Sequence, residues 1–558
     1  MCLQETKNAS TKSDESDCKL RKEKPSTTII RQRRQKRDRA GSVVIQHKET
    51  IFQKKKKSRS LQKHANDYAS GGIEALAPSL VGLVVLGFII MGQMGFRGRA
   101  TTAGIDLGTT NSVICVQAPS KGVGEITCIT DPNTNSSILP SVVSFLEGRE
   151  IPKKKKDSKC LLEPHLSPPP AHVVVGQEAK YRIDSHPHQT VYHAKRMLGR
   201  SIDDPAVVAM RKEVEFQISS SKRQEEGDSH NDARIEVIHE KNEISLAPSQ
   251  IGAYIVHYMM DLAANQLGHG NVQSAVICVP AKFTPEQRAE TAKAFRQAGV
   301  KVTRVLEEPA AAALAYGLHQ KDGVEYILVY DFGGGTLDVS LLHVTEGFAD
   351  VMGSDGDELL GGADFDVATA QLLAKQVNVE AVSQSLKILS DSFVQQQDLP
   401  KDFELEEELL THCPKLKETP LCTVSSLHTI GEKLKIELSA SNGQPVISSC
   451  FVPTNDALEM VSVAKFCDSI EEVDLTITLS AFNEAAAPLL ERSVLPIRRL
   501  LQDLTLSAEE VDEVVMVGGT TRMPQIRQLV QEELKVESLN THIDPDLTVA
   551  YGAASVID

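Results

Sequence analysis

The sequence predicts an α/β fold, and two features of the chain predict it. Apolar segments typical of strands alternate with segments typical of helices, in the order of an α/β protein. Two of the apolar segments run into glycine-rich turns, at residues 103–110 (AGIDLGTT) and 327–338 (ILVYDFGGGTLD). A third glycine pair follows another apolar segment, at residues 517–522 (VGGTTR).

The first two turns are built alike. Each strand delivers an aspartate, Asp106 or Asp331, which is followed by glycine and then threonine. Glycine lets backbone N–H groups approach a phosphate without a Cβ in the way, and aspartate can hold the water ligands that Mg²⁺ keeps. One such turn is equally well explained as an ordinary hairpin. Two copies and the third glycine pair predict a nucleotide site between two lobes.

Other regular elements are expected between and after these turns. A helix at 285–298 has Thr284 as its cap and Gly299 at its end, which are typical helix boundaries. Residues 153–170 predict a surface loop, and the acidic run at 398–408 predicts an insertion. The remaining expected elements are a strand at 271–279, a helix at 308–317 and a strand at 511–517.

Charge is distributed unevenly along the chain. Of the 558 residues, 1–72 carry 19 Lys/Arg against 8 Asp/Glu, so a total charge of −15 leaves −26 for the remainder. An acidic body of this kind argues against nucleic acid as a partner, because binding its phosphates needs a basic surface. The basic start itself has few apolar residues and predicts a disordered leader.

An uncharged segment follows the basic leader. Residues 75–96 contain no charged residue, and as a helix they would span roughly 33 Å, enough to cross a bilayer. A signal-peptide core is the alternative. Basic residues are denser before this segment than after it, which predicts a signal or signal-anchor at 73–96 and a body in the endoplasmic reticulum lumen. The acceptor sequence at Asn135 would be usable there, making the protein a glycoprotein.

The ten cysteines predict neither a disulfide framework nor a zinc site, because they are scattered and have no metal-ligand spacing. Cys115 and Cys278 fall in apolar runs and are expected to be small core residues.

From residue 103 to the last residue, the chain resembles the ATPase domain of the heat-shock-70 chaperone family, within the actin and sugar-kinase superfamily. The resemblance implies an actin-like (ribonuclease-H-like) two-lobed domain with duplicated mixed sheets, and within the family it is closest to the microsomal, Stch-like branch. It implies lobes at 103–322 and 323–558, with the acidic insertion near 380–425. The matching segments, in the family's order, are 104–110, 194–200, 279–281, 308–309, 331–338, 360–362, 518–524 and 544–546.

The resemblance assigns roles to single residues. Catalytic roles are implied for Lys195, Glu308, Asp331 and Thr336, with Lys195 reaching the γ-phosphate and the attacking water. The implied positions around Mg²⁺ are Asp106, Asp331 and Asp338. The implied contacts to ATP or ADP are Gly108, Thr109, Thr110, Gly333, Gly334, Gly335, Gly362, Glu432, Lys435, Ser439, Gly518, Gly519, Arg522 and Asp546.

Three departures from the family pattern stand close to these positions. Ile436 replaces an arginine that packs on adenine, which implies weaker nucleotide binding. Asn111 replaces an aromatic residue and Ala363 replaces an acidic one. None of the three removes a phosphate or metal contact, so hydrolysis remains the expectation.

The resemblance leads to an ATP-hydrolysing, chaperone-like protein of the microsomal compartment. Only 12 residues follow Asp546, so no peptide-binding domain is expected and turnover should be independent of peptide. The alternative is a regulatory module that binds ATP and a partner chaperone machinery with little turnover. A small-molecule kinase is a third hypothesis. Expected partners are chaperone or ubiquitin-like proteostasis proteins, and a membrane if the segment at 73–96 is retained.

Overall fold

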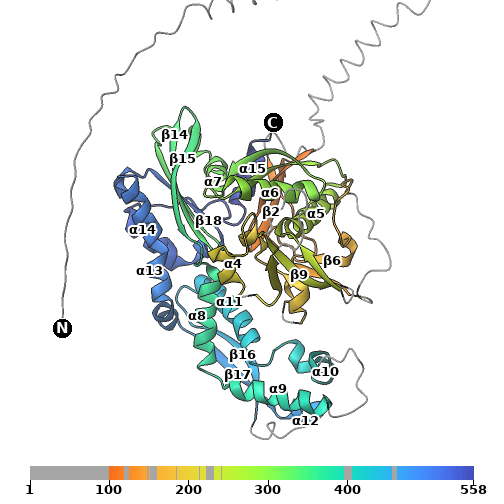
Figure 1. Cartoon of the computed structure of the whole chain (residues 1–558). Coiled ribbons are helices and arrows are strands. Elements are labelled where there is room, and N and C mark those ends of the chain that lie inside the picture. The colour runs from red at the N-terminus through yellow and green to blue at the C-terminus, as the bar shows by residue number, and fades with distance from the viewer. Residues whose placement is uncertain are drawn as a thin grey trace, which may run out of the picture. The chain divides into compact units, whose positions relative to one another are not determined.

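The computed structural model describes residues 100–117, 125–147, 150, 160–183, 185–212, 214–220, 231–239, 242–394, 405–454 and 462–557 (Figure 1). The leader and the apolar segment predicted at 73–96 lie outside these residues, as does most of the acidic run at 398–408. Within the described residues, no helix is both long and apolar enough to cross a bilayer. The membrane prediction therefore stays a prediction.

The first large sheet carries the first glycine turn. Its strand order is β12-β11-β1-β2-β3, with β4 also paired to β2. β1 and β2 form an antiparallel hairpin, whereas β11 pairs in parallel with both β1 and β12. The strands are β1 (Thr102–Leu107), β2 (Asn111–Gln117), β3 (Ile126–Cys128), β4 (Leu139–Pro140), β11 (Ser274–Val279) and β12 (Lys301–Glu307).

The second large sheet repeats this plan. Its order is β15-β14-β13-β18, where β13 and β14 form an antiparallel hairpin and β18 pairs with β13 in parallel. The hairpin register places Asp331 directly opposite Asp338. The strands are β13 (Tyr326–Phe332), β14 (Leu337–Thr345), β15 (Phe348–Asp357) and β18 (Glu513–Val517). Two sheets that each hold a hairpin beside a parallel strand agree with the predicted duplication.

Smaller sheets extend both halves of the described body, the half that contains the first large sheet and the half that contains the second. One group of strands comprises β5 (Val143–Phe145), β6 (Val173–Val175), β7 (Thr190–Val191), β8 (Gln217–Ser220), β9 (Ala233–His239) and β10 (Asn242–Leu246). The hairpin of β16 (Val446–Pro453) and β17 (Ile470–Ile477) stands apart from them, among α8 to α12 (Figure 1).

Helices cover the sheets, and their ends follow from local sequence. The predicted helix at 285–298 is α6 (Pro285–Gln297), capped by Thr284, which accepts a hydrogen bond from the N–H of Gln287. The predicted helix at 308–317 is α7 (Glu308–Ala315). The other helices are α3 (Gln177–Lys180), α4 (Pro205–Met210), α5 (Pro248–Leu267), α8 (Gly362–Ala374), α9 (Val379–Val394), α10 (Leu405–His412), α11 (Val424–Ala440), α12 (Val463–Asp468), α13 (Leu479–Asp503), α14 (Pro524–Leu534) and α15 (Thr548–Ser555).

α15 connects the two halves by very close packing. A Cβ added at Gly104 of β1 would lie 2.2 Å from the nitrogen of Ala554, and one at Gly552 would lie 1.8 Å from the carbonyl oxygen of Ala311 in α7. Side chains from α7, α15 and strands of both large sheets form one shared apolar core. The last helix therefore packs against the strand that ends near Asp106 and the helix that begins at Glu308. The lobe boundary expected at 322/323 stays a prediction.

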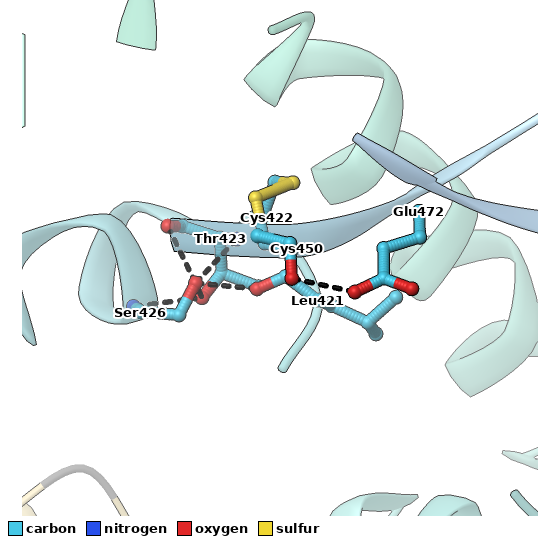
Figure 2. The surroundings of a disulfide bond; sticks show 7 residues. Leu421, Cys422, Thr423, Ser426, Cys450 and Glu472 are labelled. Atoms are coloured by element: carbon cyan, nitrogen blue, oxygen red, sulfur yellow. Dashed lines mark hydrogen bonds between the residues drawn. A yellow bond between two sulfur atoms is a disulfide. The ribbon is translucent and has the colours of Figure 1, made fainter. Parts of the chain in front are cut away.

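Three disulfides show that the prediction of no disulfide framework was wrong. One joins directly paired residues of β2 and β3, so Cys115 is bonded rather than free. Another joins the residue before the cap of α11 to β16 (Figure 2). Cys278 is buried and unbonded, as predicted. The bonds are Cys115–Cys128, Cys413–Cys467 and Cys422–Cys450.

The spacing of these cysteines concealed their pairing. Partners are 13, 28 and 54 residues apart, and strand pairing or helix packing brings them together. Sequence spacing alone carries no such information.

Candidate functional site

Four carboxylates converge where the two hairpins meet. Asp106 lies at the end of β1, Asp331 near the end of β13, Asp338 at the start of β14 and Glu308 at the start of α7. Burial, and then the negative charge of Glu308, raise the pKa of Asp106 to about 7 and that of Asp338 to about 6. The same causes raise the pKa of Asp331 well above its usual range. The site therefore favours protons or a cation among these groups.

Lys195 provides a cation beside the carboxylates. It lies in the short 3-10 helix η4 (Ala194–Met197), and its Nζ is 2.7 Å from Oε1 of Glu308. The two side chains are 8% and 13% exposed, so the pair is shielded from solvent. Burial acts to lower the pKa of Lys195, but Glu308 and Asp106 outweigh it and the pKa is raised. Lys195 is therefore a fixed positive charge at neutral pH, as its predicted role requires.

The first and the second glycine-rich turn lie close to each other. A Cβ added at Gly334 would lie 2.7 Å from Oγ1 of Thr110. Among the described residues, neither this hydroxyl oxygen nor Oδ1 of Asp106 has a hydrogen-bond partner, although both are buried. Buried polar atoms normally have partners, so these two atoms indicate a place for a polar ligand.

The carbonyl groups of the second turn are all occupied. Gly333 accepts from the N–H of Gly362 at 3.1 Å and Gly334 accepts from the N–H of Ala363 at 2.8 Å. Gly335 accepts from Arg196 Nη2 at 2.5 Å. By contrast, the N–H groups of Gly334, Gly335 and Thr336 donate to no other described residue. These N–H groups are thus available to an anion, which is how glycine-rich turns bind phosphate.

This donor set fits a hydrated Mg²⁺ ion and phosphate groups. In the part of the chain that the structure describes, no three His, Cys, Asp or Glu side chains converge closely enough to chelate a metal directly. Mg²⁺ usually keeps several waters, and Asp106, Asp331 and Asp338 can accept hydrogen bonds from them. A small cavity lined by Glu308, Asp331, Asp338 and Lys282 lies next to this centre.

α11 presents three of the residues predicted to contact ATP or ADP, namely Glu432, Lys435 and Ser439. Lys435 Nζ lies 2.7 Å from Oδ1 of Asp366 and donates to the carbonyl of Gly362 at 3.1 Å, which ties α11 to the start of α8. The N–H of Gly362 in turn donates to the second turn. Ser439 donates to the carbonyl of Lys435 in its own helix. Glu432 pairs with Lys180 of α3 at 3.2 Å, a contact between distant parts of the sequence.

The third turn lies beside the segment that precedes α15. Gly519 approaches Asp546, because a Cβ added there would lie 3.1 Å from the carboxylate. Arg522 pairs with Asp546 at 2.9 Å and also with Asp544. Asp546 contributes to the raised pKa of Asp106, so this segment reaches the carboxylate centre.

Ile436 follows Glu432 by one helical turn and is 59% exposed. The structure thus brings Lys195 and the four carboxylates together, whereas Glu432 and Ser439 are bonded to Lys180 and to their own helix. The side chain of Ile436 is largely exposed.

Sequence reasoning missed three residues of this region. Arg196 donates to the carbonyl of Gly335 in the second turn, and Asp366 forms an ion pair with Lys435. Asp544 forms an ion pair with Arg522, which also pairs with Asp546. Each could have been suspected from its neighbours, since Arg196 follows Lys195, Asp366 follows Gly362 by four residues and Asp544 precedes Asp546 by two. Their partners come from distant segments, so the contacts themselves needed the fold.

Comparison with known families agrees with this geometry. The family model described as Hsp70 protein matches residues 168–397 and 417–557, which include Lys195, Glu308 and the second and third turns. The chain belongs to the Hsp70 family. Hsp70 proteins are ATPases of the chaperone type, with an actin-like two-lobed fold that binds ATP or ADP with Mg²⁺. The first turn precedes the matched residues, and its pairing with the second turn comes from the structure.

Proposed function

We propose that this Hsp70 chain binds Mg·ATP between its two hairpin turns and hydrolyses it to ADP and phosphate without needing a bound peptide. The observation that carries the proposal is the shielded pair of Lys195 and Glu308, 2.7 Å apart, beside three carboxylates whose pKa values are raised. Taking several charged groups out of water costs free energy, and groups with shifted pKa values cluster at functional sites. Binding of a charged ligand is therefore a physical reason for this arrangement.

Each residue has a distinct part in this reaction. Mg²⁺, when bound, supplies positive charge to the phosphate oxygens and carries water molecules. Asp106, Asp331 and Asp338 would hold the ion by accepting hydrogen bonds from those waters. Lys195 stabilises the charge that grows on the γ-phosphoryl oxygens, and Glu308 keeps its ammonium group in place. The N–H groups of the second turn and the hydroxyl of Thr336 would bind the phosphate oxygens and so position the nucleotide.

The decisive experiment is steady-state ATP turnover by the full-length chain, with Asp331→Asn and Lys195→Ala as comparisons. The unmodified chain should release phosphate at least tenfold faster than either variant, because each variant removes charge stabilisation. Equal rates for all three proteins would sink the catalytic proposal.

We further propose that the body acts in the endoplasmic reticulum lumen, as a member of the microsomal, Stch-like branch. Three disulfides support this location, because such bonds persist in oxidising compartments. The apolar segment predicted at 73–96 supports entry into the same compartment. Asn135 is exposed with a φ of 53°, so its acceptor sequence is accessible for glycosylation. Glycosidase treatment that leaves the mass of the cellular protein unchanged would argue against glycosylation at Asn135.

A second function, a nucleotide-dependent interaction module, is favoured by contacts between the halves. Glu432 bonds Lys180, and Gly335 bonds Arg196, so residues of the second half hold residues of the first. A nucleotide that stabilises these contacts would alter the surface offered to a partner chaperone. Calorimetric ATP binding without phosphate release would favour this function over catalysis.

A further inference from the structure

In each phosphate turn, a hydroxyl group from outside the hairpin holds the carbonyl of the first glycine. Ser141 Oγ donates to the carbonyl of Gly108 at 2.9 Å. Thr520 Oγ1 donates to the carbonyl of Gly333 at 2.8 Å. Gly108 and Gly333 occupy the same place in the two hairpins, two residues after Asp106 and Asp331. The same type of contact is thus made twice, once in each turn.

The first contact belongs to a buried chain of hydroxyl groups. Ser141 is 3% exposed, and its own N–H donates to the carbonyl of Thr110 at 2.8 Å. Ser112 is fully buried, and its Oγ lies 2.8 Å from Oγ of Ser141. Ser141 therefore binds the carbonyls of two residues in one turn, while Ser112 fixes the direction of its hydroxyl.

The second contact is made from the third glycine turn. Thr520 is 6% exposed and lies in η9 (Gly519–Arg522), next to Gly519. A Cβ added at Gly362 would lie 2.7 Å from Oγ1 of Thr520, so the hydroxyl is enclosed on that side. Thr520 therefore joins the third turn to the second.

These contacts help to determine where the next N–H group points, and at Gly333 the hydroxyl acts together with the N–H of Gly362. In a planar trans peptide unit, the C=O and the N–H of the following residue point in opposite directions. A carbonyl of Gly108 that is held by Ser141 turns the N–H of Thr109 the other way, and Thr520 does the same for the N–H of Gly334. Neither N–H donates to another described residue.

We propose that Ser141 and Thr520 are positioning residues that aim the N–H groups of Thr109 and Gly334 at the phosphates of a nucleoside di- or triphosphate. The proposal rests on the proposed nucleotide site and adds the groups that preorganise it. A preorganised donor costs no rearrangement when the ligand binds, so loss of either hydroxyl weakens phosphate binding.

The test measures the affinity of the full-length chain for ADP and for adenosine by titration calorimetry. The variants are Ser141→Ala and Thr520→Val, each with its conservative partner, Ser141→Thr and Thr520→Ser. Ser141 lines a small cavity with Gly252 and Ile255, and threonine at this position keeps the hydroxyl group that the proposal requires. Ser112→Ala removes only the neighbour that orients Ser141.

Ser141→Ala and Thr520→Val should each weaken ADP binding about five- to tenfold, as expected for one lost hydrogen bond. Their affinity for adenosine should be unchanged, because adenosine has no phosphate. The conservative variants should stay within about twofold of the parent chain for both ligands, and Ser112→Ala should fall between. This split between ligands would not arise from a general loss of structure.

Two results would overturn the proposal. One is unchanged ADP affinity in Ser141→Ala and Thr520→Val with parental melting temperatures. The other is an equal loss of affinity for ADP and adenosine. If Ser141→Ala or Thr520→Val does not fold, the ADP and adenosine affinities of the remaining variant and of Ser112→Ala test the proposal. A parent chain that binds neither ligand would remove the proposed nucleotide site itself, whereas a binding parent with unaffected variants would remove only the positioning role.

Discussion

Lys195 and Glu308 come from segments 113 residues apart, yet their charged groups lie 2.7 Å from each other in a shielded centre. η4 supplies the ammonium group and the first turn of α7 supplies the carboxylate. Asp106 and Asp331 add further negative charge around Lys195, so its ammonium group balances the charge of several carboxylates at once.

Replacing Lys195 with methionine should therefore remove catalysis and destabilise the chain together. The variant keeps the length of the side chain but leaves Glu308 without its cation among other carboxylates. Removing one partner of a buried ion pair lowers the free energy of unfolding by about 3–5 kcal/mol, because the other charge stays buried without a partner. Denaturant unfolding at neutral pH measures this loss, and single-turnover phosphate release measures the loss of rate.

Glu308→Gln is the matched control for that experiment. It removes the opposite charge and relieves repulsion on Asp106, so it should destabilise the chain less than Lys195→Met. A larger loss of stability in Glu308→Gln than in Lys195→Met would contradict this view of the pair.

Stability without nucleotide should fall as the pH rises toward neutrality. The pKa of Asp106 is raised from its ordinary value of 3.8 to about 7, and that of Asp338 to about 6. A carboxyl group that holds its proton more tightly in the folded state stabilises the fold fully below pH 3.8, and this contribution is lost as the pH rises through the folded pKa. Melting temperatures should thus decline between roughly pH 4 and pH 7, the interval between the unfolded and the folded pKa values.

Asp106→Asn isolates this contribution, because its amide does not ionise. The decline for this variant should be shallower than for the parent chain. Mg·ADP should reduce the difference, since a cation favours ionised carboxylates. Parallel melting profiles for the two proteins would show that Asp106 ionises normally.

The local chemistry of the site could be predicted from sequence, whereas its long-range contacts could not. The sequence predicts Asp106 and Asp331, because a strand, a glycine turn and threonine are neighbours in the chain. It does not predict the bond between Cys422 and Cys450, because their approach depends on β16 lying beside the start of α11. The packing of Gly552 on Ala311 likewise depends on α15 returning to α7.

The disulfide Cys422–Cys450 should stabilise the part of the fold that carries Lys435. It fixes the start of α11, next to the capping pair of Thr423 and Ser426 (Figure 2). The bond closes a segment of 28 residues, for which chain entropy gives about 3–4 kcal/mol. The double variant Cys422→Ala/Cys450→Ala should lose about that unfolding free energy and bind ADP more weakly.

Reducing agent provides the control for the disulfide experiment. Reductant should lower the stability of the double variant less than that of the parent chain, because one bond is already gone. Free thiols at both cysteines in the native parent chain, detected by alkylation and mass spectrometry, would refute the bond.

Gly552 should tolerate no side chain. A Cβ at this position would lie 1.8 Å from the carbonyl oxygen of Ala311, so Gly552→Val must push α15 away from α7. Overpacking of a tight core typically costs about 1–3 kcal/mol, and backbone contact places this site at or above the upper end. Ser555→Ala, at an exposed position of the same helix, removes only the hydrogen bond that its Oγ donates to the carbonyl of Gly552, so it should cost about 1 kcal/mol at most. Similar losses for both variants would contradict close packing as the cause.

Lys180→Ala should speed the release of bound ADP. Lys180 of α3 bonds Glu432 of α11 at 3.2 Å, and the two side chains are 41% and 37% exposed. Ion pairs this exposed contribute little, so we expect about a two- to fivefold faster release at low salt, with the difference shrinking as salt screens the pair. Stopped-flow displacement of a fluorescent ADP analogue measures the rate. Lys433→Ala is the matched control, because Lys433 lies on α11 beside Glu432 and, among the described residues, pairs within its own helix, with Glu437 at 3.9 Å. Equal acceleration in both variants would mean that net charge, rather than the contact between the halves, governs release. A salt-independent acceleration in Lys180→Ala alone would likewise exclude the ion pair, because an exposed pair must weaken as counterions accumulate.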